Sequence, residues 1–368
     1  MSVDVTALER QARRSLPAAV YDYFAGGSGR EQTLRASEAA WREVALLPRV
    51  LRDVSRVDTS TEVSSASLRT PVGVAPTAFH GLAHPDGELA TAAGAAAAGA
   101  LYVMSTRSSR RIEDCAAATA AAGGTWWFQA YVMRDRGLTA GLARRAAAVG
   151  AAAIVLTGDT PVVGRKRRDR GDSVVTEAMF RANIGPDADL GAAEQAADVT
   201  FADIGWLGEV SGLPVIVKGV LRPGDALACA GHGAAGVIVS NHGGRQLDGA
   251  IAPARALPGV VAALRDTPRC EVFADGGLRT GEDVLAALAL GARAVFVGRP
   301  VLWALACGGA GCVRDLLTGL TTDLGHAMAL AGAARTADLD GLAAADLDGL
   351  AAADLAAADP AAVDPSPR

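Results

Sequence analysis

The sequence predicts an α/β protein built as a (β/α)8 barrel, with a helical extension before the barrel and a long lid loop after its fourth strand. Short apolar runs recur along the chain and alternate with Ala- and Leu-rich stretches that read as helices. The runs are apolar throughout, which is typical of parallel strands that are covered on both faces. Eight such units fill roughly 230 residues, close to the usual ~250 residues of this fold.

The elements follow in order along the chain. Strands are expected at residues 72–75, 102–105, 127–131, 153–157, 214–218, 236–240, 271–274 and 294–297. Helices are expected between and after them at 87–98, 112–122, 139–149, 222–231, 253–265, 281–291 and 311–330. Two helices, 5–26 and 31–44, should precede the barrel, and the interval 164–200 should form the lid loop without regular structure. A doubly wound open sheet is the alternative fold, but no Gly-x-Gly-x-x-Gly motif follows an early strand.

Composition limits the possible classes of protein. The 368 residues and the formal charge of −5 predict a single domain over residues 1–335 without a general nucleic-acid-binding surface. No stretch has the length and sustained hydrophobicity of a membrane span, and the charged N-terminal residues do not resemble a signal peptide. The five scattered cysteines suit reduced thiols in a cytoplasmic protein, and we expect no metal site. Residues 336–368, which contain a duplicated DLDGLAAA, are expected to be a disordered tail.

The most informative stretch is residues 240–249, SNHGGRQLDG, which follows an apolar strand-like run. It places His242, a base near neutral pH, three residues before Arg245, whose guanidinium can hold a carboxylate through two hydrogen bonds. A lone histidine beside a strand is more often structural, but a loop that only reverses direction does not need His, Arg, Gln and Asp together. The stretch therefore predicts proton abstraction from a small organic acid.

Two further turns predict a phosphate site. Residues 275–279, DGGLR, follow the expected seventh strand, and residues 297–300, VGRP, follow the eighth. Glycine amides and arginine side chains suit a phosphate dianion, and barrels often bind phosphate between these two strands. Both segments are otherwise ordinary tight turns.

Polar side chains follow nearly every expected strand, at the end where a barrel carries its functional residues. They are Thr77, Ser105, Gln129, Tyr131, Thr157, Asp159, Lys218, His242, Arg245, Asp275 and Arg299.

With these residues in place, the chain from about residue 16 to residue 330 resembles the FMN-dependent 2-hydroxy acid oxidases and dehydrogenases. Residues 240–249 are its most specific motif. Supporting strings are YDYFAGG (21–27), APTA (75–78), HPDGE (84–88), FQAY (128–131), TGDTP (157–161) and VKGV (217–220). The resemblance implies a barrel that binds FMN and oxidises a 2-hydroxy acid to a 2-oxo acid. It also implies O2 as the electron acceptor, with a quinone or protein as the alternative, and a homotetramer.

The resemblance also implies residue roles. His242 would be the base, Asp159 would stabilise its protonated form, Tyr131 would contact the substrate oxygen and Lys218 would lie near flavin N1. The substrate would be bound by Tyr23, Arg245, Tyr131, Lys166, Arg165 and Arg107. The cofactor would be bound by Pro76, Thr77, Ala78, Ser105, Gln129, Thr157, Lys218, Asp275, Gly276, Gly277, Arg279, Gly298 and Arg299.

Two positions depart from the family pattern. Arg107 stands where glycolate-oxidising members carry tryptophan, and Lys166 stands where the family usually places a second substrate-facing arginine. Segments 16–19, 26–31, 80–88 and 291–300 are most similar to hydroxymandelate-oxidising members. We therefore expect an aromatic substrate such as 4-hydroxymandelate, with lactate or glycolate as the alternative. An FMN-dependent isomerase or a non-catalytic flavin-binding protein are further alternatives, which the Tyr23, His242 and Arg245 set argues against.

Overall fold

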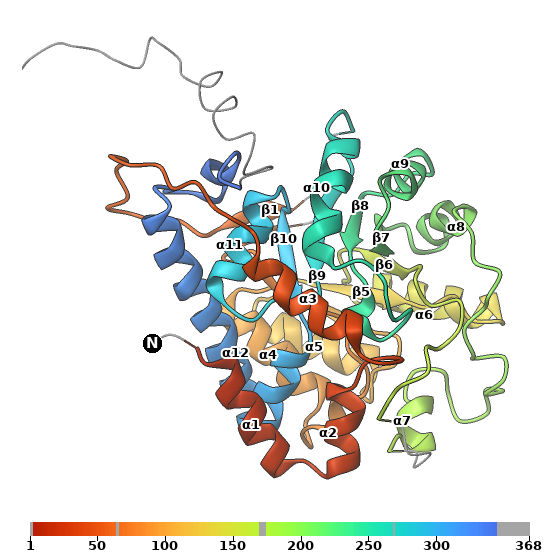
Figure 1. Ribbon diagram of the computed structural model, residues 1–368. Coiled ribbons are helices and arrows are strands. Elements are labelled where there is room, and N and C mark those ends of the chain that lie inside the picture. Colours follow the sequence, from red (N-terminus) through yellow and green to blue (C-terminus); the bar gives the residue numbers. More distant parts are fainter. Residues whose placement is uncertain (1–2, 64–65, 169–173, 268, 344–368) are drawn as a thin grey trace, which may run out of the picture.

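Eight parallel strands close into a barrel, so the predicted fold is confirmed (Figure 1). The computed structural model describes residues 3–63, 66–168, 174–267 and 269–343. Each strand pairs with its neighbours in chain order, and the last strand closes the barrel against the first. The barrel strands are β3 (Val72–Val74), β4 (Tyr102–Ser105), β5 (Trp126–Ala130), β6 (Ile154–Thr157), β7 (Val215–Val220), β8 (Gly236–Val239), β9 (Glu271–Asp275) and β10 (Ala294–Val297).

A helix follows every barrel strand and covers its outer face. These helices are α4 (Glu88–Ala98), α5 (Ile112–Ala121), α6 (Arg136–Ala148), α8 (Ala202–Ser211), α9 (Pro223–Gly231), α10 (Pro253–Leu264), α11 (Gly281–Ala289) and α12 (Arg299–Leu330). Three of them begin with proline at a first-turn position, where the absent N–H costs nothing. Small residues allow close packing: a Cβ on Gly94 of α4 would lie 2.6 Å from the carbonyl oxygen of Ala310 in α12.

Aromatic side chains fill the inside of the barrel. The ring centroids of Trp127, Phe273 and Phe296 lie 5.5–5.9 Å apart, and all three side chains are fully buried. A short antiparallel hairpin, β1 (Thr61–Val63) and β2 (Ala66–Leu68), contributes Val63 and Leu68 to the same cluster. This hairpin, which we did not predict, contacts the amino-terminal end of the barrel, where Thr61 Oγ1 donates to Arg293 O at 3.3 Å just before β10.

Three helices precede the barrel: α1 (Val5–Ser15), α2 (Ala18–Ala25) and α3 (Gln32–Arg42). We expected one helix over residues 5–26, which is wrong. Leu16 is extended, with φ −86° and ψ 146°, because the ring of Pro17 disfavours helical backbone in the residue before it. In Figure 1, α1 lies beside α12, which it contacts.

The interval 164–200 holds more structure than expected. It contains α7 (Glu177–Arg181), and Gln195 forms an isolated bridge with Met133, which attaches the segment to the barrel. Helix α8, which follows this interval, was not predicted either.

Helix α12 begins at Arg299, twelve residues before the expected start, and non-helical Gly308 and Gly309 kink it. By length and composition alone it is apolar enough to cross a membrane, but half of its most apolar window is buried within the protein.

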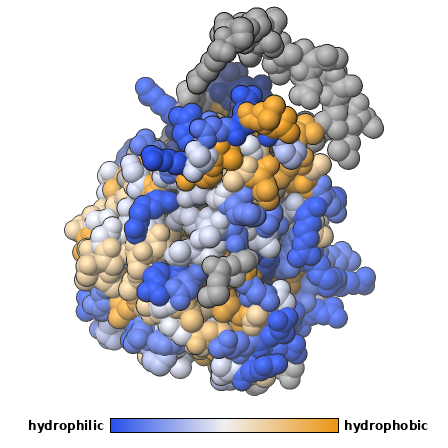
Figure 2. Space-filling view, turned by 90° about the vertical axis from the view of Figure 1, so that its left-hand side faces the viewer, coloured by the Kyte–Doolittle hydropathy of each residue, from blue (hydrophilic) through white to orange (hydrophobic). Residues whose placement is uncertain are grey.

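The boundary predicted at residue 335 is too early. A 3-10 turn (Thr336–Leu339) follows α12, Leu339 and Leu342 are fully buried, and the backbone N–H of Leu47 donates to Leu342 O at 2.7 Å. The rest of the expected tail lies outside the described residues. Figure 2 shows a face on which hydrophilic and apolar side chains are mixed, with apolar side chains gathered at its left side and upper part.

Candidate active site

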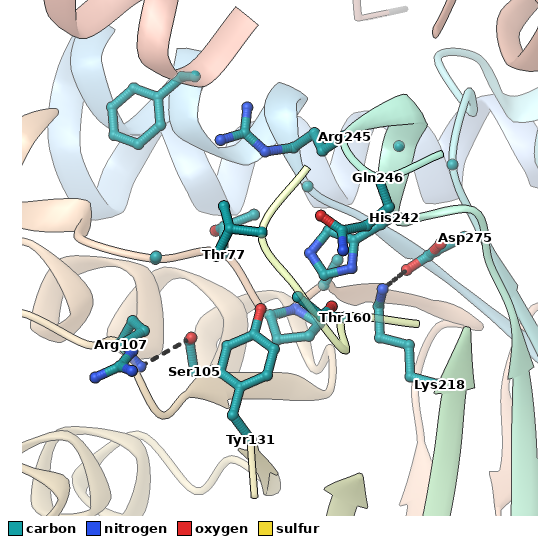
Figure 3. A pocket seen from close by; sticks show the side chains of 18 of the residues that line it. Thr77, Ser105, Arg107, Tyr131, Thr160, Lys218, His242, Arg245, Gln246 and Asp275 are labelled. Carbon is teal, nitrogen blue, oxygen red and sulfur yellow. Dashed lines mark hydrogen bonds and ion pairs between the residues drawn. The ribbon is translucent and has the colours of Figure 1, made fainter. Parts of the chain in front are cut away.

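A cavity of about 640 Å³ opens at the carboxyl ends of the barrel strands, where the sequence placed the functional residues. Figure 3 shows side chains from several strand ends converging on it. Of the predicted site residues, it is lined by Tyr23, Pro76, Thr77, Ala78, Ser105, Arg107, Tyr131, Lys166, Lys218, His242, Arg245, Asp275, Gly276, Gly277, Arg279, Gly298 and Arg299.

The predicted base and its carboxylate partner are paired. His242 Nδ1 lies 2.9 Å from Asp159 Oδ1, although the two residues are 83 positions apart. Asp159 follows β6 and His242 follows β8, so the barrel brings them together. Because Asp159 accepts the Nδ1 proton, the lone pair of the neutral ring is on Nε2, which has no hydrogen-bond partner in the described part of the chain and can accept from a substrate.

The surroundings keep this pair in the protonation states that a base requires. Burial lowers the pKa of His242 below its usual value, and the charges of Lys218 and Arg245 lower it further against the opposing effect of Asp159. Burial alone raises the pKa of Asp159, but His242 and Lys218 together hold it at about 2. At neutral pH the imidazole is therefore neutral and the carboxylate is charged.

A serine connects the base to the buried lysine. Ser240 Oγ accepts hydrogen bonds from Lys218 Nζ at 2.9 Å and from the backbone N–H of His242 at 3.0 Å. Lys218 Nζ also lies 3.4 Å from Asp275 Oδ2, and the two side chains are only 4% and 7% exposed (Figure 3). The ammonium is thus fixed at the cavity wall.

Arg245 and Tyr23, which we predicted to bind the substrate carboxylate, lie against each other at the cavity. The guanidinium carbon of Arg245 lies 5.4 Å from the ring centroid of Tyr23, and its NH1 donates to the carbonyl oxygens of Tyr23 and Gly26 at 2.8 and 2.9 Å. NH1 is thereby anchored, and no partner of Nε or NH2 is recorded among the described residues. Burial raises the pKa of the Tyr23 hydroxyl and of the Tyr131 hydroxyl, so both remain donors.

The two Gly/Arg turns predicted to bind phosphate meet at one end of the cavity. Arg299 donates to the carbonyl oxygens of Phe24 and Gly26, both at 3.1 Å, and Arg279 pairs with Glu38 at 2.6 Å. Burial, reinforced by the charges of Arg245 and Arg279, lowers the pKa of Arg299 to about 9. Such a crowded group of cations is suited to an anionic ligand.

Gln129 and Thr157 lie behind the cavity wall and do not line it. Gln129 Nε2 donates to Thr157 Oγ1 at 2.9 Å, and Ser105 Oγ donates to Gln129 Oε1 at 3.1 Å. Ser105 does line the cavity, and its hydroxyl hydrogen is directed to Gln129 behind the wall.

Lys166 reaches the cavity, whereas Arg165 does not. Lys166 forms an isolated bridge with Ser28, and its ammonium donates to Arg245 O. Successive side chains of an extended chain point to opposite faces, so Arg165 is exposed. Placing Arg165 in the substrate site was therefore wrong. Burial, with Arg245 and Arg299 nearby, lowers the pKa of Lys166 to about 7.

Several residues that shape the site were not assigned a role from the sequence. Gln246 Nε2 donates to the carbonyl oxygens of Asp159 and Val162 at 3.0 and 2.9 Å, which fixes the segment that carries the acid. The position of Gln246 within the 240–249 motif was the sequence feature that could have indicated this role. Phe180 and Gln195 line the cavity from the lid region, where no sequence pattern marked them. Among the described residues, no three His, Cys, Asp or Glu side chains are grouped to hold a metal ion.

Known proteins are similar to this chain in sequence and fold. The family model described as FMN-dependent dehydrogenase matches residues 12–345. The chain belongs to this family. It is 40% identical to an L-lactate oxidase of Nostoc (92% of this chain, 96% of the relative) and 43% identical to a 4-hydroxymandelate oxidase of Amycolatopsis orientalis (90% and 94%). A crystal structure of mandelate oxidase with benzoyl-formic acid matches with a TM-score of 0.84 and 42% identity, covering 92% of this chain and 97% of that chain.

The protein is therefore an FMN-dependent oxidoreductase, and its cavity fits that cofactor. Arg279, Arg299 and the neighbouring glycines suit the phosphate. Asp275 Oδ1 is buried without a hydrogen-bond partner in the described part of the chain, so it is available to accept from a bound ligand. The small side chains of Pro76 and Ala78 leave room for a flat ring against the cavity wall.

Proposed function

We propose that this oxidoreductase converts an aromatic (S)-2-hydroxy acid, such as 4-hydroxymandelate or mandelate, to the 2-oxo acid and reduces O2 to H2O2. The observation that carries the proposal is the imidazole of His242, which lines the same cavity as Arg245 and is held from behind by Asp159, a residue that does not itself line the cavity, at 2.9 Å. A neutral base beside a fixed cation is the arrangement needed to deprotonate an anionic alcohol. The names of the lactate, hydroxymandelate and mandelate oxidase relatives support the same chemistry.

Each residue has a defined part in this reaction. Arg245 and Tyr23 hold the substrate carboxylate, with Lys166 as a further cation, and thereby present the alcohol carbon to His242. His242 Nε2 accepts a proton, and Asp159 stabilises the imidazolium that results. Tyr131 donates to the oxygen that becomes a carbonyl. Bound FMN would take up the two electrons and the second hydrogen of the alcohol.

The cofactor-holding residues follow from the same geometry. Arg279, Arg299, Gly277 and Gly298 would hold the phosphate. Lys218, fixed by Ser240 and Asp275, would place its positive charge where the reduced ring becomes negative. Pro76, Thr77, Ala78 and Ser105 would contact the ring, with Gln129, Thr157 and Gly276 supporting the same wall.

Anaerobic mixing with a panel of acids tests the proposal. Each acid, (S)-4-hydroxymandelate, (S)-mandelate, (S)-lactate or glycolate, is added to the FMN-loaded protein, and loss of the yellow flavin absorbance is followed. We expect every accepted acid to bleach the flavin and the aromatic acids to give the highest specificity constants. If no acid bleaches the flavin, hydroxy acid oxidation is wrong. A higher specificity constant for lactate or glycolate would show that the aromatic assignment is wrong.

The electron acceptor and the assembly are proposed on the same family basis. Readmission of air should restore the flavin colour and release one H2O2 per oxidised acid. A cytoplasmic homotetramer is the assembly that we propose, and light scattering after gel filtration measures its mass.

A further inference from the structure

The wall of the cavity formed by β4 and the lid region carries an arginine with few partners. Arg107 follows β4, and its guanidinium carbon lies 4.1 Å from the ring centroid of Phe180. Its NH2 donates to Ala193 O at 2.7 Å, and this is the one hydrogen bond recorded for the guanidinium among the described residues. A guanidinium offers five N–H donors, so most of this group is available to a ligand.

A glutamine of the same wall is also unpartnered. Gln195 lies two residues after Ala193, lines the cavity, and has a buried Oε1 that no donor reaches within the described chain. Glu194, between them, is engaged outside this pair by Arg134 at 2.8 Å. The wall thus combines N–H groups of Arg107 that are available to donate with an amide oxygen of Gln195 that is available to accept.

The chemistry of these two groups selects the ligand. A hydroxyl accepts one hydrogen bond and donates another, so it satisfies a guanidinium and an amide oxygen together. A second carboxylate would only accept, and would leave Gln195 Oε1 without a donor. Phe180 and Val163 add apolar surface to the same cavity, which suits a ring that carries the hydroxyl.

The position of Arg107 matches the far end of a substrate. In the view of Figure 3, Arg107 and His242 lie on either side of Tyr131. An acid whose alcohol carbon faces His242 would extend its side chain past Tyr131 toward Arg107.

We propose that Arg107 and Gln195 form a specificity subsite that binds a hydroxyl group on the aromatic ring of the substrate. This inference rests on the proposed oxidation of an aromatic 2-hydroxy acid and adds the residues that distinguish a ring hydroxyl from an unsubstituted ring. Arg107 donates to the hydroxyl oxygen, and the hydroxyl donates to Gln195 Oε1.

Two ratios measure the subsite. The first is kcat/KM for (S)-4-hydroxymandelate divided by kcat/KM for (S)-mandelate. The second is the ratio of dissociation constants for phenylacetate and 4-hydroxyphenylacetate, which lack the 2-hydroxyl and are followed by their perturbation of the flavin absorbance. Hydrogen bonds to charged groups contribute enough to change such ratios by about 10- to 100-fold.

Arg107→Met should lower both ratios by about tenfold or more, and Gln195→Leu should lower them less because it removes a neutral partner. Arg107→Lys should keep part of the preference because it retains one charged donor. Arg144→Met is the matched control: Arg144 is an exposed residue of α6 and is not among the residues that line the cavity, so both ratios should stay at the wild-type values. FMN content and circular dichroism verify that each variant is folded.

Unchanged ratios in a folded Arg107→Met protein that still oxidises mandelate would overturn the subsite and leave the proposed function standing. Failure of every hydroxy acid to reduce the wild-type flavin would instead remove the proposed function. The ligand chemistry is tested by (S)-2-hydroxyglutarate. If the wild type prefers it to 4-hydroxymandelate and Arg107→Met loses that preference, Arg107 binds a second carboxylate and the hydroxyl assignment is wrong.

Discussion

The imidazole of His242 is attached to a backbone in an unusual conformation. His242 has φ 58°, in the left-handed region, and the two glycines after it also have positive φ. In a residue other than glycine, this backbone conformation costs about 1–3 kcal/mol of conformational free energy. Hydrogen bonds to Ser240 and Asp159 hold the residue in place despite that cost. Backbone strain at this position thus coincides with the group assigned as the base.

Asp159→Asn should change the reaction in two ways. Because the Asp159 charge raises the pKa of His242, its removal should lower that pKa and move the acid limb of the flavin-reduction profile to lower pH. The maximal rate should fall, because the imidazolium loses its stabilising partner, within the about 10²–10⁴-fold range typical of acid–base groups. Stopped-flow absorbance from pH 5 to 9 measures both. His242→Ala, which should retain FMN, gives the reference for loss of the base. An acid limb that moves to higher pH in Asp159→Asn would contradict the assignment.

At the level of the elements, a bulge in β7 makes room for the acid. The pairing of β7 with β8 shifts between Lys218 and Val220, and Gly219 between them has φ 105°. A Cβ on Gly219 would lie 2.5 Å from the Cβ of Asp159. The bulge therefore lets the Asp159 segment pack against β7.

Gly219→Ala should consequently affect both stability and catalysis. The positive φ alone should cost about 1–3 kcal/mol of unfolding free energy, and the displaced Asp159 should slow flavin reduction. Urea unfolding and stopped-flow absorbance give the two values. Gly224→Ala is the matched control, because Gly224 is in helix α9 and its Cβ would meet no atom within 4 Å. Equal stability of the two variants would show that the bulge tolerates a side chain.

The elements also show where sequence reasoning works. Buried parallel strands are continuous apolar runs, so all eight were found. Helix α8 was missed because Gly205 and Gly208 interrupt a short helix that buries few apolar residues. The part of α12 that follows Gly308 and Gly309 was predicted, but the helical turns before these glycines were not.

The candidate site shows the same division. His242 and Arg245 were predictable because one short motif carries both. Phe180, in the five-residue helix α7, and Gln195, in an irregular segment, were not, because neither stretch is long or regular enough for a period to mark its inward side chains. Which of Arg165 and Lys166 points into the cavity is decided by the bridge between Lys166 and Ser28. These two residues are 138 positions apart, so the local sequence does not reveal their pairing.

At the scale of the whole molecule, the N-terminal helices form part of the active site. Asp248, in the loop after β8, accepts from the backbone N–H groups of Arg30 and Thr33 at 2.7 and 2.9 Å. Trp41 Nε1 donates to Gly276 O at 2.8 Å in the loop after β9. Arg245 and Arg299 bind carbonyl oxygens at the end of α2. Segments from both ends of the chain thus enclose the expected cofactor.

Arg299 belongs to the cation group, and within the described ranges it has no carboxylate in salt-bridge contact. Arg299→Met should therefore weaken FMN binding far more than riboflavin binding. The phosphate is the one anionic group that distinguishes the two ligands. Excess FMN should raise the melting temperature of the wild-type apoprotein, since a ligand at 100 times its dissociation constant adds about 2.7 kcal/mol to the unfolding free energy. The variant should lose most of this rise. Calorimetric dissociation constants for both flavins provide the direct measurement, and equal losses for FMN and riboflavin would contradict a phosphate role.

The hydrogen bonds that join residues 23–33 to the loops after β8 and β10 limit which segments can be exchanged between this protein and a relative. A chimera that exchanges only the loop around Arg245 with a relative would present its guanidinium to foreign carbonyl oxygens and lose the backbone partners of Asp248. Residues 23–33 and the loop after β8 depend on each other. A chimera that is meant to carry over the substrate preference of a relative would therefore have to exchange both segments together.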